Sequence, residues 1–462
     1  MKINLRFNIL CFLSFCSLLT VGQLNVNANG YQVLLKKSTD VKKYESVLKK
    51  KDIQIDDSIP EIGYLQVDTK TSEHKSLSVL QSVGKVKLIA CSKTQNSSSS
   101  PSESRLQQSL TLPTLFSYQW DMQSVTHNGD AYKKYFPNKE STVGIIDSGV
   151  MSTHPALENQ LVGTQKNFVP KNGYDGQEPY ENGNKDFTGD LKGHGTVVAG
   201  QISAKGLING IAPGIGIRSY RVFGKEKSKT TWILKAIIAA TQDRVKVINL
   251  SLGQYLPVTN PRNSSAICEE PYLEEQAYKS AVQYALSHKT LVVAATGEDG
   301  TSEKQKDLKE LYKKQHSQTV SKKVRILDYP ASIPGVISVG SSNNENYKST
   351  FSNYYEKKRK DFVLAPGGDT ILLRQYGKSK WFEEKLFMKE SILSTTNDGN
   401  YNYQSGTSLS AGKVSGLLAE IIGKYNLQNS PQKAVQILIR SCSYSKDGYR
   451  IIDANTALSQ NY

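Results

Sequence analysis

The sequence has few cysteines and no long hydrophobic run beyond its start. Its 462 residues include only five cysteines, too few for a disulfide-rich scaffold. After residue 21 no apolar stretch approaches the roughly 20 residues that a membrane-spanning helix needs, so we expect no membrane anchor. Hydrophobic residues make up 38% and charged residues 22% of the chain, which excludes a wholly disordered protein and a multi-span membrane protein.

The chain has fewer acidic residues than basic ones. The chain carries 42 Asp and Glu against 58 Lys and Arg, a net charge of +16. Such a charge suits binding to nucleic acid or to an anionic surface. The basic residues are scattered, however, and the sequence has neither a basic-aromatic module nor zinc-ligand spacing. We therefore expect no nucleic-acid partner and interpret the charge as that of a secreted protein near an anionic cell wall or membrane surface.

Residues 1–28 have the features of a secretory signal peptide. Lys2 and Arg6 precede an apolar run over 9–21, and the small residue Ala28 offers a cleavage site. The apolar run is shorter than a membrane span requires. We expect cleavage after Ala28 and a secreted, extracellular protein.

Two folding units are expected after this signal. In 29–93, strand-like and helix-like segments alternate, which predicts a small α+β domain with helices on one face of a sheet. The serine-rich stretch 94–111 predicts an exposed, flexible linker. From 112 to 462, short apolar runs alternate with helical patterns, which is typical of an α/β domain with a parallel sheet. The charged stretch 301–328 is expected to be a surface insertion. The expected strands include 142–146, 246–250, 290–295 and 335–339, and the expected helices 231–242, 274–287 and 411–425.

Three short motifs of the larger unit contain residue types used in nucleophilic catalysis. Asp147 follows an expected strand, at the edge where open α/β sheets place their sites. His194 lies between two glycines, which leave its imidazole open. Ser408 opens an expected helix, where backbone N–H groups can stabilise an anion. Taken singly, the three residues can equally be a strand-end cap, a core histidine and a helix cap.

Together and in this order, the motifs resemble those of the subtilisin-like serine proteases, the subtilases. The resemblance covers about 112–462 and implies a subtilisin-like parallel sheet with helices on both faces. It also implies that Ser408 attacks the scissile carbonyl, that His194 takes and returns its proton, and that Asp147 orients the imidazole. The substrate would then pair as an added strand with Ser251-Leu252-Gly253.

One position departs from the family pattern. Glu298 stands where the family has an asparagine that donates a hydrogen bond to the oxyanion. An ionised carboxylate cannot donate, and loss of such a donor costs about 10²–10³-fold in rate. Three alternatives stay open: a Glu298 kept protonated by burial, an oxyanion hole formed by the Ser408 amide and the Thr407 hydroxyl, or an inactive subtilase-fold binding protein.

The resemblance also assigns a role to the small N-terminal unit. Residues 29–93 occupy the place of the family's ferredoxin-like pro-domain, an intramolecular inhibitor; an unrelated binding domain is the alternative. Arg105 is the one basic residue between Lys93 and Trp120, which predicts maturation by a cut after Arg105. A pocket for arginine needs a carboxylate, and the candidates are Asp299, Asp328 and Glu298.

The segment 118–122, the signal peptide, the medium-sized pro-domain and the compact catalytic domain resemble the lantibiotic leader peptidases. Those enzymes remove the leader from an exported, modified precursor peptide, usually after arginine. The resemblance implies a secreted serine endopeptidase that acts on such a peptide through an acyl-enzyme. A general secreted subtilisin-like protease is the alternative. The chemistry requires no cofactor, and a structural calcium ion remains open because the loop at 204–210 is short for the family's calcium site.

Overall fold

The computed structural model describes most of the chain from residue 30 onward. The expected signal peptide with Ala28 and the expected linker with Arg105 lie outside the described residues, so both remain predictions. The described ranges are 30–51, 53–69, 73–82, 86–91, 115–134, 139–224, 227–261, 267–357 and 359–460.

The N-terminal unit is a small antiparallel sheet with helices on one face. Its described strands lie in the order β2-β3-β1-β4. Alternate residues of β1 point to opposite sides: Tyr31 and Val33 pack with α1 and α2, whereas Leu34 packs against the larger unit. The predicted small α+β unit is therefore confirmed. Its elements are β1 (Gly30–Leu35), η1 (Ser38–Asp40), α1 (Val41–Lys49), β2 (Gln54–Ile59), η2 (Pro60–Ile62), β3 (Tyr64–Asp68), α2 (Glu73–Ser82) and β4 (Val86–Cys91).

The larger unit is built on a mostly parallel sheet. Its described strands lie in the order β16-β17-β13-β12-β10-β8-β5-β7-β6, and β16 alone among them pairs antiparallel. Ile145 and Ile146 are both fully buried but belong to the cores on opposite faces of the sheet. Burial on both faces explains the unbroken apolar run in this strand. The strands are β5 (Val143–Asp147), β6 (Lys166–Asn167), β7 (Ile217–Arg221), β8 (Val247–Leu250), β10 (Leu291–Ala295), β12 (Val336–Ser342), β13 (Phe362–Pro366), β16 (Ser443–Tyr444) and β17 (Arg450–Ile451).

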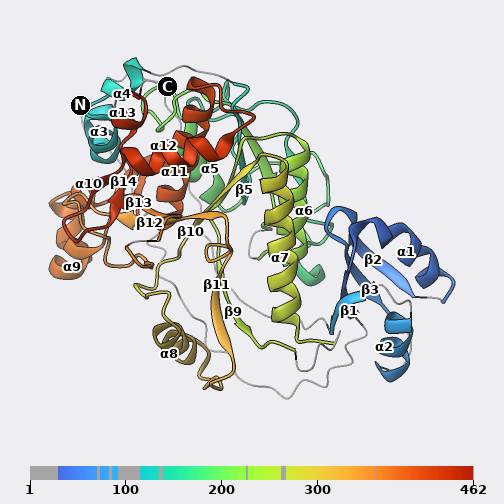
Figure 1. The fold of residues 1–462 in the computed structure, drawn as a ribbon. Coiled ribbons are helices and arrows are strands. Elements are labelled where there is room, and N and C mark those ends of the chain that lie inside the picture. Colours follow the sequence, from blue (N-terminus) through green and yellow to red (C-terminus); the bar gives the residue numbers. More distant parts are fainter. Residues whose placement is uncertain are drawn as a thin grey trace.

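Helices cover both faces of this sheet (Figure 1). On the Ile145 face pack α5, α11 and α12, and on the Ile146 face pack α6 and α7. The predicted subtilisin-like α/β architecture is therefore confirmed. The helices of this layer arrangement are α3 (Trp120–Thr126), α4 (Asp130–Lys133), α5 (His194–Ser203), α6 (Thr230–Gln242), α7 (Glu270–Ser287), α11 (Thr407–Lys424), α12 (Pro431–Ser441) and α13 (Ala454–Ala457), with short 3₁₀ turns η3 (Leu115–Tyr118) and η4 (Tyr174–Gly176).

Two small two-stranded sheets, β9 with β11 and β14 with β15, lie outside the main sheet. The strand β9 follows directly after Gly253 and pairs antiparallel with β11, and α8 packs on β11. The expectation of a surface insertion at 301–328 holds for α8, in which Leu308 is the one buried residue. It does not hold for β11, where Ile326 and Asp328 are buried. The elements outside the main sheet and its covering helices are β9 (Gln254–Val258), α8 (Gln305–His316), β11 (Arg325–Tyr329), α9 (Ile371–Glu383), α10 (Phe387–Glu390), β14 (Ile392–Thr395) and β15 (Tyr401–Gln404).

Candidate active site

The structure brings the predicted aspartate and histidine into direct contact. Asp147 is the last residue of β5 and is 1% exposed, and His194 is the first residue of α5. The Nδ1 atom of His194 lies 2.7 Å from Oδ1 of Asp147. Burial lowers the pKa of His194, but the Asp147 carboxylate outweighs it and leaves the pKa raised. Asp147 therefore orients the imidazole and favours its protonated form, as the predicted roles require.

A second buried carboxylate, Asp190, holds the Asp147–His194 pair in place. The sequence did not reveal this role. Asp190 accepts hydrogen bonds from the Thr196 hydroxyl at 2.7 Å and from the Ser148 hydroxyl at 2.8 Å. The Ser148 hydroxyl in turn accepts the Gly195 backbone N–H at 3.0 Å. A Cβ at Gly195 would lie 2.0 Å from the Gly149 carbonyl oxygen, so no other residue fits there. The only sequence signal for this network was an aspartate four residues before the histidine.

The predicted nucleophile opens α11 and lies against the predicted substrate strand. The Ser408 hydroxyl is 3.4 Å from the Ser251 carbonyl oxygen, and the Ser251 hydroxyl donates to the Ser408 carbonyl at 2.9 Å. The Asn249 amide donates to the same Ser251 hydroxyl at 2.9 Å. These bonds tie the start of α11 to the end of β8. The predicted strand partner Ser251-Leu252-Gly253 thus lies beside the nucleophile.

Glu298 also reaches the start of α11. It follows the end of β10 after Gly297, whose φ of +90° turns the chain. Its Oε1 atom accepts the Thr407 backbone N–H at 2.9 Å. Burial raises the pKa of Glu298 to about 7, although the Thr407 N–H and the charge of His194 act in the opposite direction. The neutral and ionised forms of Glu298 are therefore both accessible near neutral pH.

Asp328 lies beneath the predicted substrate strand. It is 6% exposed, and a Cβ on Gly253 would lie 3.8 Å from its Oδ1 atom. Its Oδ2 atom accepts the Tyr355 hydroxyl at 3.0 Å. Burial raises the pKa of Asp328 to about 8, and none of the ion pairs in the described part of the chain includes it. Asp328 is therefore a buried carboxylate outside every described ion pair, and the charge of nearby Arg359 opposes the effect of burial on its pKa only in part.

Asp299, the other pocket candidate, is already occupied by neutral donors. Its Oδ2 atom accepts the Tyr255 hydroxyl at 2.7 Å, and its Oδ1 atom accepts the Gln315 amide at 3.0 Å. Both oxygens thus accept side-chain donors, whereas Asp328 accepts one, from Tyr355. The structure favours Asp328 over Asp299 as the carboxylate for a cationic side chain.

The described residues contain no group of three or more His, Cys, Asp or Glu side chains placed to hold a metal ion. The structural calcium ion therefore stays a sequence-based expectation.

The Thr407 hydroxyl, predicted as an oxyanion donor, is buried at the start of α11.

Comparisons with known proteins agree with this geometry. The family model described as "Subtilase family" matches residues 138–457. The epidermin leader peptide-processing serine protease EpiP of Staphylococcus epidermidis is 39% identical over 423 residues, which cover 90% of this chain and 88% of that protein. The nisin leader peptide-processing serine protease NisP of Lactococcus lactis is 41% identical over 325 residues, covering 70% of this chain and 46% of that protein. A crystal structure of EpiP from Staphylococcus aureus is similar with a TM-score of 0.81 and 34% identity, covering 94% of this chain and 99% of that one.

Proposed function

We propose that this chain, which belongs to the subtilase family of serine proteases, is a secreted peptidase that removes the leader from a lantibiotic precursor peptide by cutting after arginine. The relatives named above, EpiP and NisP, are leader peptide-processing proteases. The single observation that supports the arginine preference is the buried Asp328 beneath Gly253, whose pKa is raised and which makes no ion pair among the described residues. Secretion is supported by the signal-like sequence at 1–28. In the described residues no helix is long and apolar enough to cross a membrane.

The chemistry follows from the triad. His194 takes the proton of the Ser408 hydroxyl as this oxygen attacks the scissile carbonyl, and an acyl-enzyme forms when the amine leaves with that proton. Water then attacks the ester while His194 takes one of its protons. His194 returns this proton to the Ser408 oxygen as the acid product leaves. The hydrogen bond from His194 Nδ1 to Asp147 leaves Nε2 as the atom that exchanges the proton with Ser408.

An arginine before the cut would supply the direct ion-pair partner that Asp328 does not have among the described residues. The guanidinium is planar and offers paired donors that match the two oxygens of a carboxylate. Its arrival would restore the ionised form of Asp328, whose pKa burial has raised to about 8. A neutral side chain in the same place would leave the carboxyl group protonated. The pocket thus discriminates by charge rather than by volume.

The small unit acts as an inhibitory pro-domain in this proposal. Its sheet packs on α6 and α7, with Leu34 and Tyr64 in the shared core. The Gln32 amide donates to Glu270 at 2.5 Å, and the Cys268 backbone N–H donates to the Ile89 carbonyl at 3.0 Å. The last of these bonds holds β4, after which the chain continues toward Arg105.

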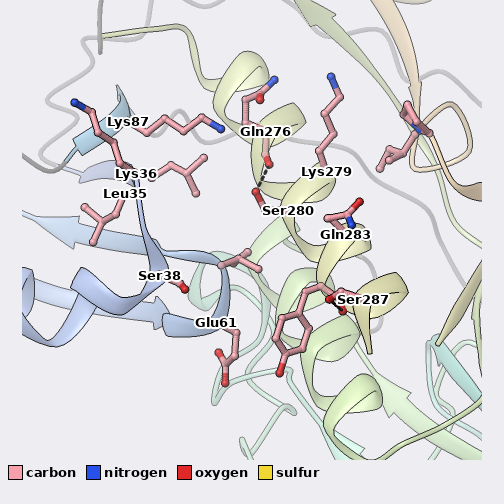
Figure 2. Close-up of a pocket in the computed structure, with 15 residues that line it drawn as sticks. Leu35, Lys36, Ser38, Glu61, Lys87, Gln276, Lys279, Ser280, Gln283 and Ser287 are labelled. Carbon is pink, nitrogen blue, oxygen red and sulfur yellow. Dashed lines mark hydrogen bonds between the residues drawn. The ribbon is translucent and has the colours of Figure 1, made fainter. Parts of the chain in front are cut away.

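An open cleft lies beside the contact between the two units. It has a volume of about 570 Å³ and is lined by residues of β1, η2 and α7. Figure 2 shows Lys36, Lys87 and Glu61 of the pro-domain on one side of this cleft and Gln276, Lys279 and Gln283 of α7 on the other, with Lys87 extending toward Gln276.

The proposal is tested with the matured enzyme, a lantibiotic precursor peptide and casein, with products read by mass spectrometry. We expect one cut after the arginine that precedes the mature peptide, no cut when that arginine is changed to glutamine, and casein left intact. The Ser408→Ala variant should cut nothing. Digestion of casein at many sites would instead support a general secreted protease. Failure to cut any peptide would support a binding protein with a subtilase fold.

A further inference from the structure

We infer that Glu298 is the oxyanion donor of this protease and acts in its protonated form, so that the enzyme is switched off when this carboxyl group ionises. The inference rests on the serine-protease chemistry proposed above but not on the identity of the substrate. Ionisation of Glu298 sets an upper pH limit on the activity of this enzyme. An asparagine in the same place would set no such limit, because its amide group donates at every pH.

The backbone places the Glu298 carboxyl group one residue from the nucleophile. Its Oε1 atom accepts the N–H of Thr407, which directly precedes Ser408. A Cβ on Gly406 would lie 2.5 Å from the same Oε1 atom, so the carboxyl group rests directly on the turn that leads into α11. Any tetrahedral intermediate on Ser408 therefore forms beside this group.

The hydrogen bond also decides where the proton resides. Because Oε1 is engaged as the acceptor of the Thr407 N–H, the proton of the neutral acid belongs on Oε2. That O–H is then the donor for the developing oxyanion, while Oε1 keeps the side chain in place. Carboxylic acids held neutral in apolar sites are known to serve as oxyanion donors. An ionised Glu298 would place a second negative charge against the oxyanion instead.

The surroundings of Glu298 set the pH at which it ionises. Burial favours its neutral form most strongly, and Asp299 on the same loop adds to this effect. The N–H and the hydroxyl of Thr407 on α11 and the charge of His194 on α5 favour the ionised form. Asp328 on β11 lies near Asp299. With the pKa of Glu298 raised to about 7, the donor is present below pH 7 and is progressively lost above it.

A structural role for Glu298 makes the opposite prediction. A carboxylate near the first N–H groups of a helix stabilises that helix most when it is ionised. If capping of α11 were its only role, ionisation would not reduce activity. The Glu298→Gln variant separates the two roles, because its carbonyl oxygen still accepts the Thr407 N–H while its NH₂ group donates at every pH.

The experiment measures kcat/KM from pH 5.5 to 9 for the wild type, Glu298→Gln and Glu298→Ala. The ratio of wild type to Glu298→Gln at each pH removes the effect of Asp328 and other titrating groups common to both. We expect this ratio to be constant below pH 6, to fall about tenfold per pH unit above pH 7, and to approach a loss on the order of 10²-fold at pH 9. The Glu298→Ala variant should be slow by a similar factor at every pH.

Two controls make the outcome decisive. Glu345→Gln makes the same chemical change at an exposed glutamate and should reproduce the wild-type profile. Labelling of Ser408 by a fluorophosphonate at pH 6 reports whether the triad works and whether each variant is folded. A wild type that is labelled but gives a flat ratio across the pH range would overturn the oxyanion role of Glu298 alone. A wild type that is never labelled would overturn the proposed protease function.

Discussion

Replacing Asp328 by asparagine should convert the enzyme from an arginine-directed protease into one without a charge preference. The change keeps the shape of the pocket and the acceptor for Tyr355 but removes the charge beneath Gly253. Removing one partner of a buried charge pair costs about 2–5 kcal/mol. Against this stands the cost of ionising a carboxyl group whose pKa is raised to about 8, about 1.4 kcal/mol at pH 7. The net loss of kcat/KM for arginine substrates at pH 7 is then about 0.6–3.6 kcal/mol, or about 3- to 400-fold.

The assay compares two peptides that differ only in arginine or leucine before the cut. Their ratio of kcat/KM cancels the titrations of His194 and Glu298, because both substrates need the same catalytic groups. Since Asp328 must ionise to pair with arginine and its pKa lies near 8, the wild-type ratio should rise about tenfold per pH unit up to pH 8 and then level off. In Asp328→Asn the ratio should be small and independent of pH.

Asp299→Asn is the matched control, because both of its carboxylate oxygens are already held by Tyr255 and Gln315. It should change the arginine-to-leucine ratio much less than Asp328→Asn does. The reasoning is refuted if Asp328→Asn keeps the wild-type ratio, or if Asp299→Asn carries the loss.

Three further predictions concern the pro-domain, the core and maturation. Burial and the charge of Glu270 raise the pKa of Glu274 to about 7 at the pro-domain interface. In the unprocessed Ser408→Ala protein, docking should therefore weaken as the pH rises through 7, and Glu274→Gln should abolish this dependence in hydrogen exchange over α7. Lys413 and Asp121 form a fully buried ion pair between α11 and α3. Lys413→Met should therefore lower the free energy of unfolding by about 3–5 kcal/mol, as measured by chemical denaturation. Adding Asp121→Asn to this variant should restore part of the lost free energy. Arg105→Gln should leave the secreted protein with its pro-domain attached, as seen on a gel.

The sequence was sufficient to predict the features that depend on local pattern. The apolar run that becomes β5 ends at Asp147, and the glycines around His194 mark a close approach of backbone segments. The predicted helix at 274–287 begins earlier, at Glu270, because Pro271 fits the first turn of a helix and does not interrupt it.

The contacts that the sequence did not reveal are long-range and polar. Asp190 stabilises the triad through Ser148 from 42 residues away, and no periodicity marks such a pair. The choice between Asp299 and Asp328 likewise depended on which carboxylate is already satisfied by other side chains. Those partners become visible only when β9, β11 and α8 are placed together in space.

The most direct test of the central claim, a self-maturing serine protease that cuts after arginine, is the intact mass of the secreted wild-type protein beside that of Ser408→Ala. The account predicts that the wild type loses everything before residue 106 and that the variant keeps its pro-domain. If both proteins carry the pro-domain, or if both lose it, the chain does not process itself through Ser408 and the central claim is contradicted.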